Sequence, residues 1–346
     1  EILRCLVGSE MCIRDRPIRP AAADVQHFYP ASSRTHGFFS YLCSMLRLSL
    51  LVATYNRSAS LLGALESVAG QRADPAVWEC VVVDNNSQDD TAACVEAFRQ
   101  AHPGLNLRLV RESRQGLSHA RNRGIAESRG EYLAIIDDDE RINPDFVRAY
   151  IDFFDTHPEA AAAGGRIIAE YPQGRPRWMS RWTEAPIANP IDLGPKVRPF
   201  PPGRIPGGGN MALRRTAVEK HGAFDPSLGR TGKRLLGGEE SDLFERLRKG
   251  GEQIWYVPDA VMWHIIGPEK LTEDYFDRLS FNVGRSQRAR AEIHGRMVRL
   301  LLGEALKWAA TLVLAAGCLL GMRPAKAGRL LRMRARITRG ILCSRT

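Results

Sequence analysis

The first half of the chain alternates short apolar runs with segments of helical periodicity. Three runs have the length and composition of strands buried on both faces: LRLSLLVA at 46–53, CVVV at 80–83 and YLAII at 132–136. The segments around them predict helices at 58–70, 91–100, 117–128 and 144–157, and an alternating strand at 105–110. Strands and helices that alternate in this way form a parallel sheet with right-handed crossovers, so we predict an α/β fold.

The second half has a less regular pattern. Residues 171–206 contain nine prolines and no periodicity, which indicates a binding or lid loop. Ordered structure is expected again at 207–213, followed by a helix at 241–249 and short strands at 254–257 and 261–263. From Thr272 the pattern is helical.

Polar residues follow each of the buried strands. They are Thr54-Tyr55-Asn56, Asp84-Asn85-Asn86-Ser87 and Asp137-Asp138-Asp139. In open sheets of this kind, ligands bind beyond the carboxyl ends of the strands. These residues are therefore the first candidates for a binding site.

The cluster Asp137-Asp138-Asp139 is the most informative of the three. Three neighbouring carboxylates repel one another, and a divalent cation such as Mg²⁺ or Mn²⁺ removes that penalty while it binds substrate phosphates. A solvated acidic turn or a helix cap would explain the same residues. The position at the ligand-binding edge of the sheet favours the metal.

Asp84 and Tyr55 are candidates for binding a nucleotide base. Asp84 can accept a hydrogen bond from the N3–H of uracil or thymine, or it can begin an Asx turn before Thr91. Tyr55 can stack on a base, or it can be an ordinary half-buried aromatic residue.

A second acidic cluster is Gly238-Glu239-Glu240-Ser241-Asp242-Leu243, at a predicted helix start. A carboxylate beside glycines at this place is available as a general base. Ordinary capping explains Ser241 and Asp242 well, so we reserve catalysis for Glu240 and treat Asp242 as partly structural.

Several ordered motifs over residues 45–266 together resemble the family 2 glycosyltransferases, inverting enzymes of the GT-A fold. The motifs are LLVATYNR, VVVDNNSQDDT, GLSHARNRGIAESRGEYLAIIDDDERINPDF, GGGNMALRR and GGEESDLFERLRKGG. Processive members carry a Gln-x-x-Arg-Trp motif after the base and several membrane spans. This chain has neither, so it resembles the non-processive members of bacterial type, which transfer single sugars.

The resemblance implies a role for each matching residue. Those implied to bind the nucleotide sugar are Ala53, Thr54, Tyr55, Asp84, Arg121, Asp137 and Asp138. Asp139 would coordinate the metal that bridges the diphosphate, with Asp137 facing the metal or the ribose. His264 would touch the metal or the diphosphate, unless it is a structural imidazole.

The catalytic base and the acceptor side are also implied by the resemblance. The family usually has a Glu-Asp pair where this chain has Glu239-Glu240, so either glutamate can be the base. The acceptor side would include Gly208, Gly209, Asn210 and Asp242, and we add Trp178 and Trp182 from the proline-rich segment.

The charge of the chain is concentrated in its tail. The net charge is +10, but residues 285–346 carry 14 Lys and Arg against two Glu, and the preceding residues are close to neutral. The run 308–322 has no charge; as a helix it covers about 22 Å, short of the roughly 30 Å of a bilayer core. In 323–345, four apolar residues recur at helical spacing opposite arginines: Leu330, Met333, Ile337 and Ile341. This pattern predicts a helix lying on anionic lipid, or else a helix packed on the catalytic domain or a dimer partner.

The N-terminal residues differ from the rest. VGSEMCIRDR at 7–16 resembles a translated sequencing-adaptor read-through, and the strand pattern begins at Met45. We therefore expect that Met45 is the natural start and that 1–44 are an artefact or a disordered leader, the alternative being an irregular N-terminal extension. The remaining chain divides into a catalytic domain at 45–270 (nucleotide half 45–140, acceptor half 141–270) and a helical, basic tail at 271–346.

These features favour transfer of one sugar from a UDP- or dTDP-sugar to a lipid-linked or saccharide acceptor in cell-surface glycan synthesis. The cofactor would be Mg²⁺ or Mn²⁺, and 308–345 would hold the enzyme on the inner face of the plasma membrane, in the cytoplasm. Three other classes fit less well. A nucleotidyltransferase needs a glycine-rich basic loop after the first strand, which ATYNRSAS is not. A dehydrogenase needs GxGxxG after a strand, and a nucleic-acid-binding protein a recognisable module.

Overall fold

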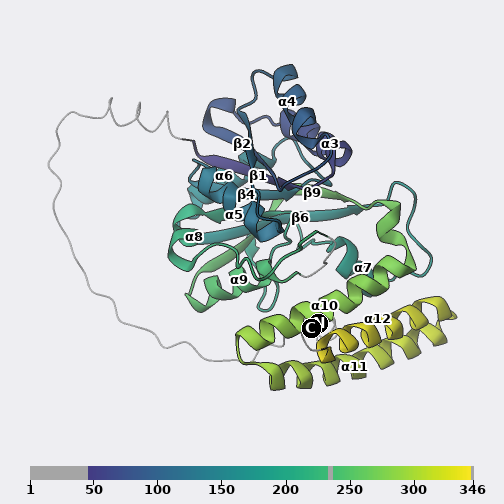
Figure 1. The fold of residues 1–346 in the computed structure, drawn as a ribbon. Helices are drawn as coiled ribbons and strands as arrows, with labels where there is room; N and C mark the ends of the chain where they lie inside the picture. Colours follow the sequence, from purple (N-terminus) through teal and green to yellow (C-terminus); the bar gives the residue numbers. More distant parts are fainter. Residues whose placement is uncertain (1–45, 233–236, 344–346) are drawn as a thin grey trace, which may run out of the picture.

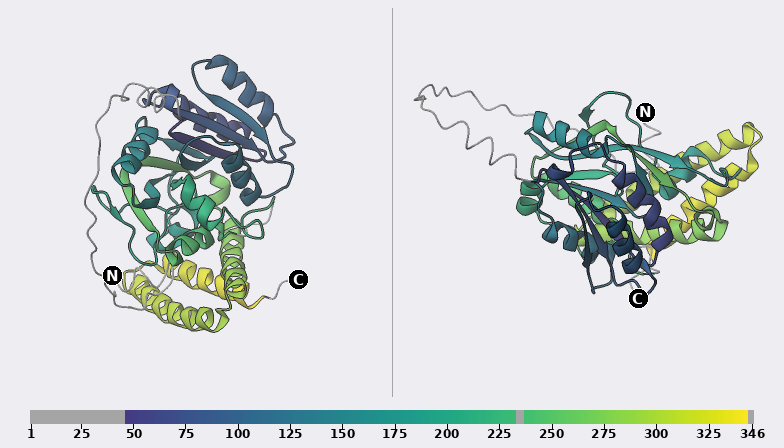
Figure 2. Two further views of the ribbon diagram at one scale, coloured as in Figure 1. Left: turned by 90° about the vertical axis from the view of Figure 1, so that its left-hand side faces the viewer. Right: turned by 90° about the horizontal axis from the view of Figure 1, so that it is seen from above.

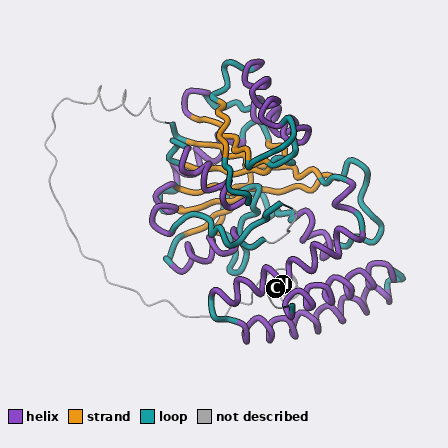
Figure 3. Tube along the Cα trace, in the orientation of Figure 1, coloured by secondary structure: helices purple, strands orange, loops and turns teal. Residues whose placement is uncertain are grey.

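The computed structural model describes residues 46–232 and 237–343. The expectation for residues 1–44 lies outside the described residues. Strands occupy the middle of the larger part of the molecule and helices lie on both sides of them (Figure 3). This arrangement buries the strands at 48–54, 78–84 and 132–137 on both faces, as their continuous apolar runs predict.

The nucleotide half is a parallel sheet with strand order β3-β2-β1-β4. The strands are β1 (Leu48–Thr54), β2 (Trp78–Asp84), β3 (Leu107–Arg111) and β4 (Tyr132–Asp137). The helices between them are α3 (Ser58–Ala69), α4 (Thr91–Ala101) and α5 (Leu117–Glu127), and the short 3₁₀ turn η1 (Pro75–Val77) precedes β2. This half follows the predicted order of elements.

The acceptor half extends the same sheet with strands of mixed direction. They are β5 (Glu140–Ile142), β6 (Ala160–Glu170), β7 (Arg198–Pro199), β8 (Met211–Arg214) and β9 (Gln253–Ile265). β8 lies between β4 and β6 and is antiparallel to both, and β9 runs parallel to β6. The helices are α6 (Phe146–Thr156), α8 (Arg215–His221) and α9 (Glu239–Lys249). The sheet therefore joins the two halves into one body.

Two predictions for this half need correction. The expected strands at 254–257 and 261–263 are parts of the single strand β9, and the register shifts between Gly165 and Arg166 of its partner β6 at that point. Residues 171–206, predicted as a loop without periodicity, contain α7 (Arg181–Ala188) and β7. Ser180 and Thr183 form a capping box that begins this helix. The predicted binding or lid role of residues 171–206 stays a prediction.

The tail forms three helices on one side of the sheet domain (Figures 1 and 2). They are α10 (Glu273–Ile293), α11 (Met297–Leu320) and α12 (Pro324–Leu342), and the 3₁₀ turn η2 (Pro268–Leu271) connects β9 to them. Of the two alternatives predicted for the apolar face of α12, contact with lipid is wrong and packing on the protein is confirmed. Leu330 is 1% exposed, and this face forms a second apolar core with residues of α10 and α7. Helical periodicity reports only that a face is apolar, and here a protein surface covers it.

The outer face of α11 has the opposite character. This helix begins 11 residues before the uncharged run at 308–322, and its inward-facing Glu304 is buried with Arg334 and Thr338 of α12. Its outward side chains are apolar and exposed, among them Leu302, Leu312, Val313 and Leu320. By length and composition, α11 is the helix in the described part of the chain that could cross a membrane. Most of the exposed large apolar side chains of the tail therefore belong to α11.

Candidate active site

The first predicted binding residues meet at one edge of the sheet. In the parallel register, Thr54 lies beside Asp84 and Ala53 beside Asp137. Asn56, in the left-handed region at φ 51°, accepts a hydrogen bond from the Gln88 backbone N–H at 2.7 Å. This contact ties the loop after β1 to the loop after β2.

Asp84 is buried and forms the expected Asx turn, accepting the Ser87 backbone N–H at 2.9 Å through Oδ1. This turn does not require Oδ2, so binding of a base by Asp84, and by the half-buried Tyr55, stays a prediction. The neighbouring Asn85, also among the candidates, has a structural role. Its amide donates to the carbonyls of Glu112 and Arg114 and fixes the loop that leads into α5.

Asp138 points back into the protein. Its Oδ2 accepts the Thr54 hydroxyl at 2.8 Å, and Oδ1 accepts Arg57 Nη1 at 3.1 Å. Burial raises the pKa of Asp138 to about 6 in spite of Arg57. Asp138 therefore connects the ends of β1 and β4, a role that the acidic run alone does not reveal.

Asp139 lies among three cationic or basic groups. Its Oδ2 accepts Arg57 Nη1 at 3.0 Å and the ammonium of Lys270, and its Oδ1 is 3.8 Å from His264 Nε2. Burial opposes ionisation of Asp139, but the positive charges of Lys270 and Arg57 outweigh it and lower its pKa. Lys270 and Arg57 are site residues that sequence reasoning missed, since their partners lie far away in the chain.

His264 is oriented for a cation. Its Nδ1 lies 3.2 Å from the Ala188 carbonyl oxygen, which can only accept, so the neutral ring presents the lone pair of Nε2 toward Asp139. Burial lowers the pKa of His264, which favours this neutral form.

These donors fit a hard divalent cation chemically. Carboxylate oxygens and one imidazole suit Mg²⁺ or Mn²⁺. Asp139 also already contacts one cation, the ammonium of Lys270. Within residues 46–232 and 237–343, no three Asp, Glu, His or Cys side chains are close enough to enclose a metal alone. Substrate phosphates would have to complete the coordination, as is usual for Mg²⁺.

Arg121 of α5 links the two acidic clusters. Its fully buried guanidinium contacts Asp137 at 3.0 Å, Glu240 at 2.9 Å and Glu239 at 3.3 Å. Burial favours a neutral guanidine, but the three carboxylates outweigh it and raise the pKa of Arg121. The family resemblance implies that Arg121 binds the nucleotide sugar. The structure shows Arg121 between the Asp137-Asp138-Asp139 cluster and the glutamate pair.

The glutamate pair begins α9, and its two members differ in burial. The side chain of Glu239 is 2% exposed and that of Glu240 is 21% exposed. Burial, together with the Glu240 charge, raises the pKa of Glu239 to about 8. Glu240 is therefore the member of the pair that can face a substrate.

Two of the three glycines of GGGNM lie directly against carboxyl groups. A Cβ on Gly208 would collide with Glu240, and a Cβ on Gly209 would collide with the buried Glu140. Glu140 was not predicted as a site residue. Its carboxylate accepts the Asp137 backbone N–H at 2.8 Å, which holds the DDD turn in place.

Four predicted acceptor-side residues have partners within the protein. Asn210 accepts the Tyr150 hydroxyl and donates to the carbonyls of Arg166 and Ala260. Asp242 pairs with Arg246 at 2.9 Å, which agrees with its partly structural role. Trp178 and Trp182 pack against the second apolar core beside the tail helices, so an acceptor role for them stays a prediction.

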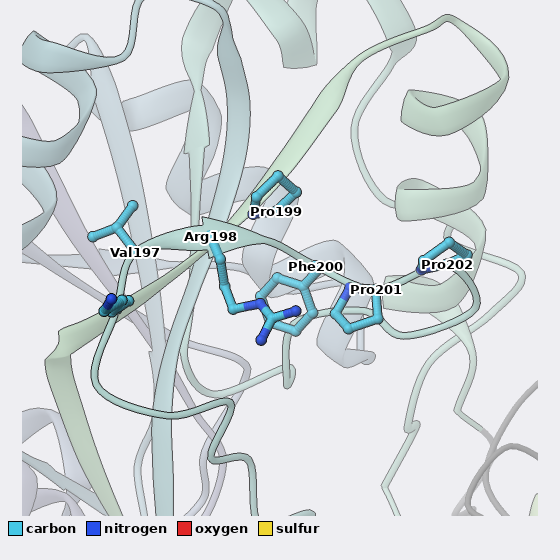
Figure 4. A pocket seen from close by; sticks show the side chains of 7 residues that line it. Val197, Arg198, Pro199, Phe200, Pro201 and Pro202 are labelled. Carbon is cyan, nitrogen blue, oxygen red and sulfur yellow. The ribbon is translucent and has the colours of Figure 1, made fainter. Parts of the chain in front are cut away.

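A separate open pocket is lined by residues 196–202 (Figure 4). It adjoins β7, which pairs with Trp255 and Tyr256 near the beginning of β9, whereas His264 stands near the end of that strand. This pocket therefore does not belong to the acidic site.

The fold and the site define the class of protein: a GT-A sugar transferase, with an acidic turn after β4 and a carboxylate pair at the start of α9. The family model for glycosyl transferase family 2 matches residues 49–222, half of the chain, and the protein belongs to that family. It is a glycosyltransferase.

Relatives and solved structures agree with this assignment. The chain is 24% identical over 253 residues to a glucosyl-dolichyl phosphate glucuronosyltransferase of Haloferax volcanii, covering 70% of this chain and 77% of the relative. It is 28% identical over 257 residues to the succinoglycan biosynthesis protein ExoM of Rhizobium meliloti, covering 73% and 75%. The fold resembles that of the mannosyltransferase PcManGT from Pyrobaculum calidifontis, solved with GDP-Man and Mn²⁺, at a TM-score of 0.57 and 21% identity over 85% and 87% of the chains.

Proposed function

We propose that the enzyme transfers a single sugar from a nucleoside-diphosphate sugar to an acceptor hydroxyl, with inversion at the anomeric carbon. The observation that carries the proposal is that Arg121 contacts Asp137 through Nη2 and Glu240 through Nη1. In the same acidic turn as Asp137, Asp139 lies 3.8 Å from His264. Such a site can hold the leaving diphosphate on one side of the anomeric carbon and the general base on the other, as a single in-line displacement requires.

The side chains divide the work as follows. The nucleotide base is held by Ala53, Thr54, Tyr55 and Asp84. A divalent cation would be held by Asp139 with His264. When bound, this cation neutralises the leaving diphosphate. Glu240 removes the proton of the attacking hydroxyl, and Arg121 fixes its carboxylate at 2.9 Å. Glu239 is less suited as the base, because its side chain is only 2% exposed, whereas that of Glu240 is 21% exposed.

A thermal-shift screen of nucleotide sugars, each with and without Mn²⁺, tests donor and metal together. We expect one donor to raise the melting temperature by several degrees only when Mn²⁺ is present, because a ligand at 100 times its Kd adds about 2.7 kcal/mol of stability. A uracil or thymine nucleotide is expected because of Asp84.

The matched control for this screen is Asp139→Asn, which should lose the Mn²⁺-dependent part of the shift. Stabilisation by a GDP-sugar would contradict the assignment of Asp84 to a uracil or thymine base. A full shift without metal would contradict the metal assignment.

The acceptor is proposed to be a lipid-linked or saccharide hydroxyl at the cytoplasmic face of the plasma membrane. The name of the Haloferax volcanii relative, with glucosyl-dolichyl phosphate in it, supports a lipid-linked acceptor. The outer face of α11 supports contact with lipid, because its apolar side chains are exposed and no Asp or Glu occurs from residue 305 to 346.

Flotation with vesicles tests this contact. We expect the protein to float with vesicles that contain phosphatidylglycerol, and a Leu312→Glu/Val313→Glu variant to stay in the soluble fraction, because two charges would enter the apolar face. The control is Ala335→Glu, an exposed position of α12. Lipid contact would be contradicted if the double variant floated as well as the wild type. It would also be contradicted if the wild type did not float and instead formed a dimer that the double variant disrupts.

A further inference from the structure

Lys270 is an unusual residue for its place. It lies in η2, the turn between β9 and the tail helices, and its side chain is only 7% exposed. Lysine is almost never buried to this degree unless it is paired. Its ammonium contacts Asp139 Oδ2 and lies 3.4 Å from His264 Nε2.

These two partners are the groups that the proposed function assigns to the divalent cation. The Nδ1 contact with Ala188 leaves the lone pair of His264 Nε2 for a cation, and Lys270 Nζ lies on that side of the ring. Arg57 supplies a second positive charge to the same Asp139 oxygen. The carboxylate is therefore already compensated before any metal arrives.

A divalent cation and the Lys270 ammonium cannot share this place. Two like charges at contact distance repel strongly in a site with little water. Once displaced, the ammonium needs another anion, because a buried lysine without a partner is costly. The diphosphate of the donor is the anion that enters beside Asp139 in the proposed function.

We propose that Lys270 is an internal cation that occupies Asp139 and His264 in the free enzyme, competes with the divalent metal, and moves to the donor diphosphate when metal and donor bind together. This inference rests on the proposed metal role of Asp139. It makes Lys270 a positioning residue that couples the two ligands: metal alone binds weakly, and metal with donor binds well.

The test is Mn²⁺ binding to the full-length protein by titration calorimetry, with and without UDP or the nucleotide identified by the donor screen. Without nucleotide, Lys270→Met is expected to bind Mn²⁺ at least about tenfold more tightly than the wild type, since it removes the competitor. With nucleotide, this advantage is expected to shrink, because the wild type gains the contact between lysine and diphosphate. Lys220→Met is the matched control, since Lys220 pairs with Glu252 on the surface.

Melting temperatures provide a second test, which still applies if a Lys270 variant is too unstable without metal for calorimetry. Lys270→Met and Lys270→Gln should melt at lower temperature than the wild type in EDTA, and Mn²⁺ should raise their melting temperatures by more than it raises that of the wild type. Unchanged or weaker Mn²⁺ binding in both variants would overturn the inference.

The Asp139→Asn variant distinguishes a failure of the proposed metal site from a failure of the proposed competition by Lys270. If Asp139→Asn abolishes Mn²⁺ binding while the Lys270 variants bind like the wild type, the metal site stands and the competition is refuted. If Mn²⁺ binding is the same in Asp139→Asn as in the wild type, the metal site itself is refuted, and the role of Lys270 with it.

Discussion

Replacing Glu240 by Gln is expected to lower kcat by about 10²–10⁴-fold and to leave donor affinity unchanged. The amide keeps the shape of the side chain and its contact with Arg121, but it cannot take the proton of the acceptor hydroxyl. Steady-state transfer assays, with donor Kd measured separately by calorimetry, give the two quantities.

Glu239→Gln is the matched control for this prediction. Glu239 is buried away from the acceptor, and burial raises its pKa, so an uncharged amide is tolerated better there than at Glu240. We expect a much smaller loss of kcat. The opposite order of the two losses would show that Glu239 is the base.

Replacing Arg121 by Met is expected to destabilise the protein by about 3–5 kcal/mol, because the carboxyl groups of Asp137, Glu239 and Glu240 lose the buried cation that they all contact. Activity should also fall sharply, since Glu240 loses the group that orients it. Urea denaturation measures the free energy of unfolding.

Two further variants serve as comparisons for Arg121→Met. Arg123→Met removes a surface pair with Glu127 on the same helix and should cost less than about 1 kcal/mol. Arg121→Lys keeps the charge but cannot reach three partners, so it should fall between the two. A loss of stability in Arg121→Met no larger than in Arg123→Met would contradict this role for Arg121.

The nucleotide half was predictable because its signals are local. Continuous apolar runs marked β1, β2 and β4, and the polar residues after them had to meet at one edge of a parallel sheet. The acceptor half was less predictable. β6 begins with AAAAGG, a poor strand sequence, and becomes a strand because its glycines permit close approach of Pro206, Asn210 and the Ala260 carbonyl.

The site was predicted in its residue types more than in its contacts. The acidic clusters and Arg121 were named from their motifs, but Arg57, Glu140 and Lys270 become site residues only through partners distant in the sequence. The periodicity of α12 was correctly detected and wrongly assigned, because an apolar stripe has the same spacing whether lipid or protein covers it.

The buried pair of Glu304 and Arg334 limits how the tail can meet a bilayer. Their side chains are 3.1 Å apart between α11 and α12. To cross the hydrocarbon core, α11 would have to leave α12 and carry an unpaired glutamate into lipid, at a cost of several kcal/mol. The pair therefore favours an α11 that rests parallel to the bilayer plane. Such an attachment is reversible, so alkaline carbonate should extract the enzyme without detergent.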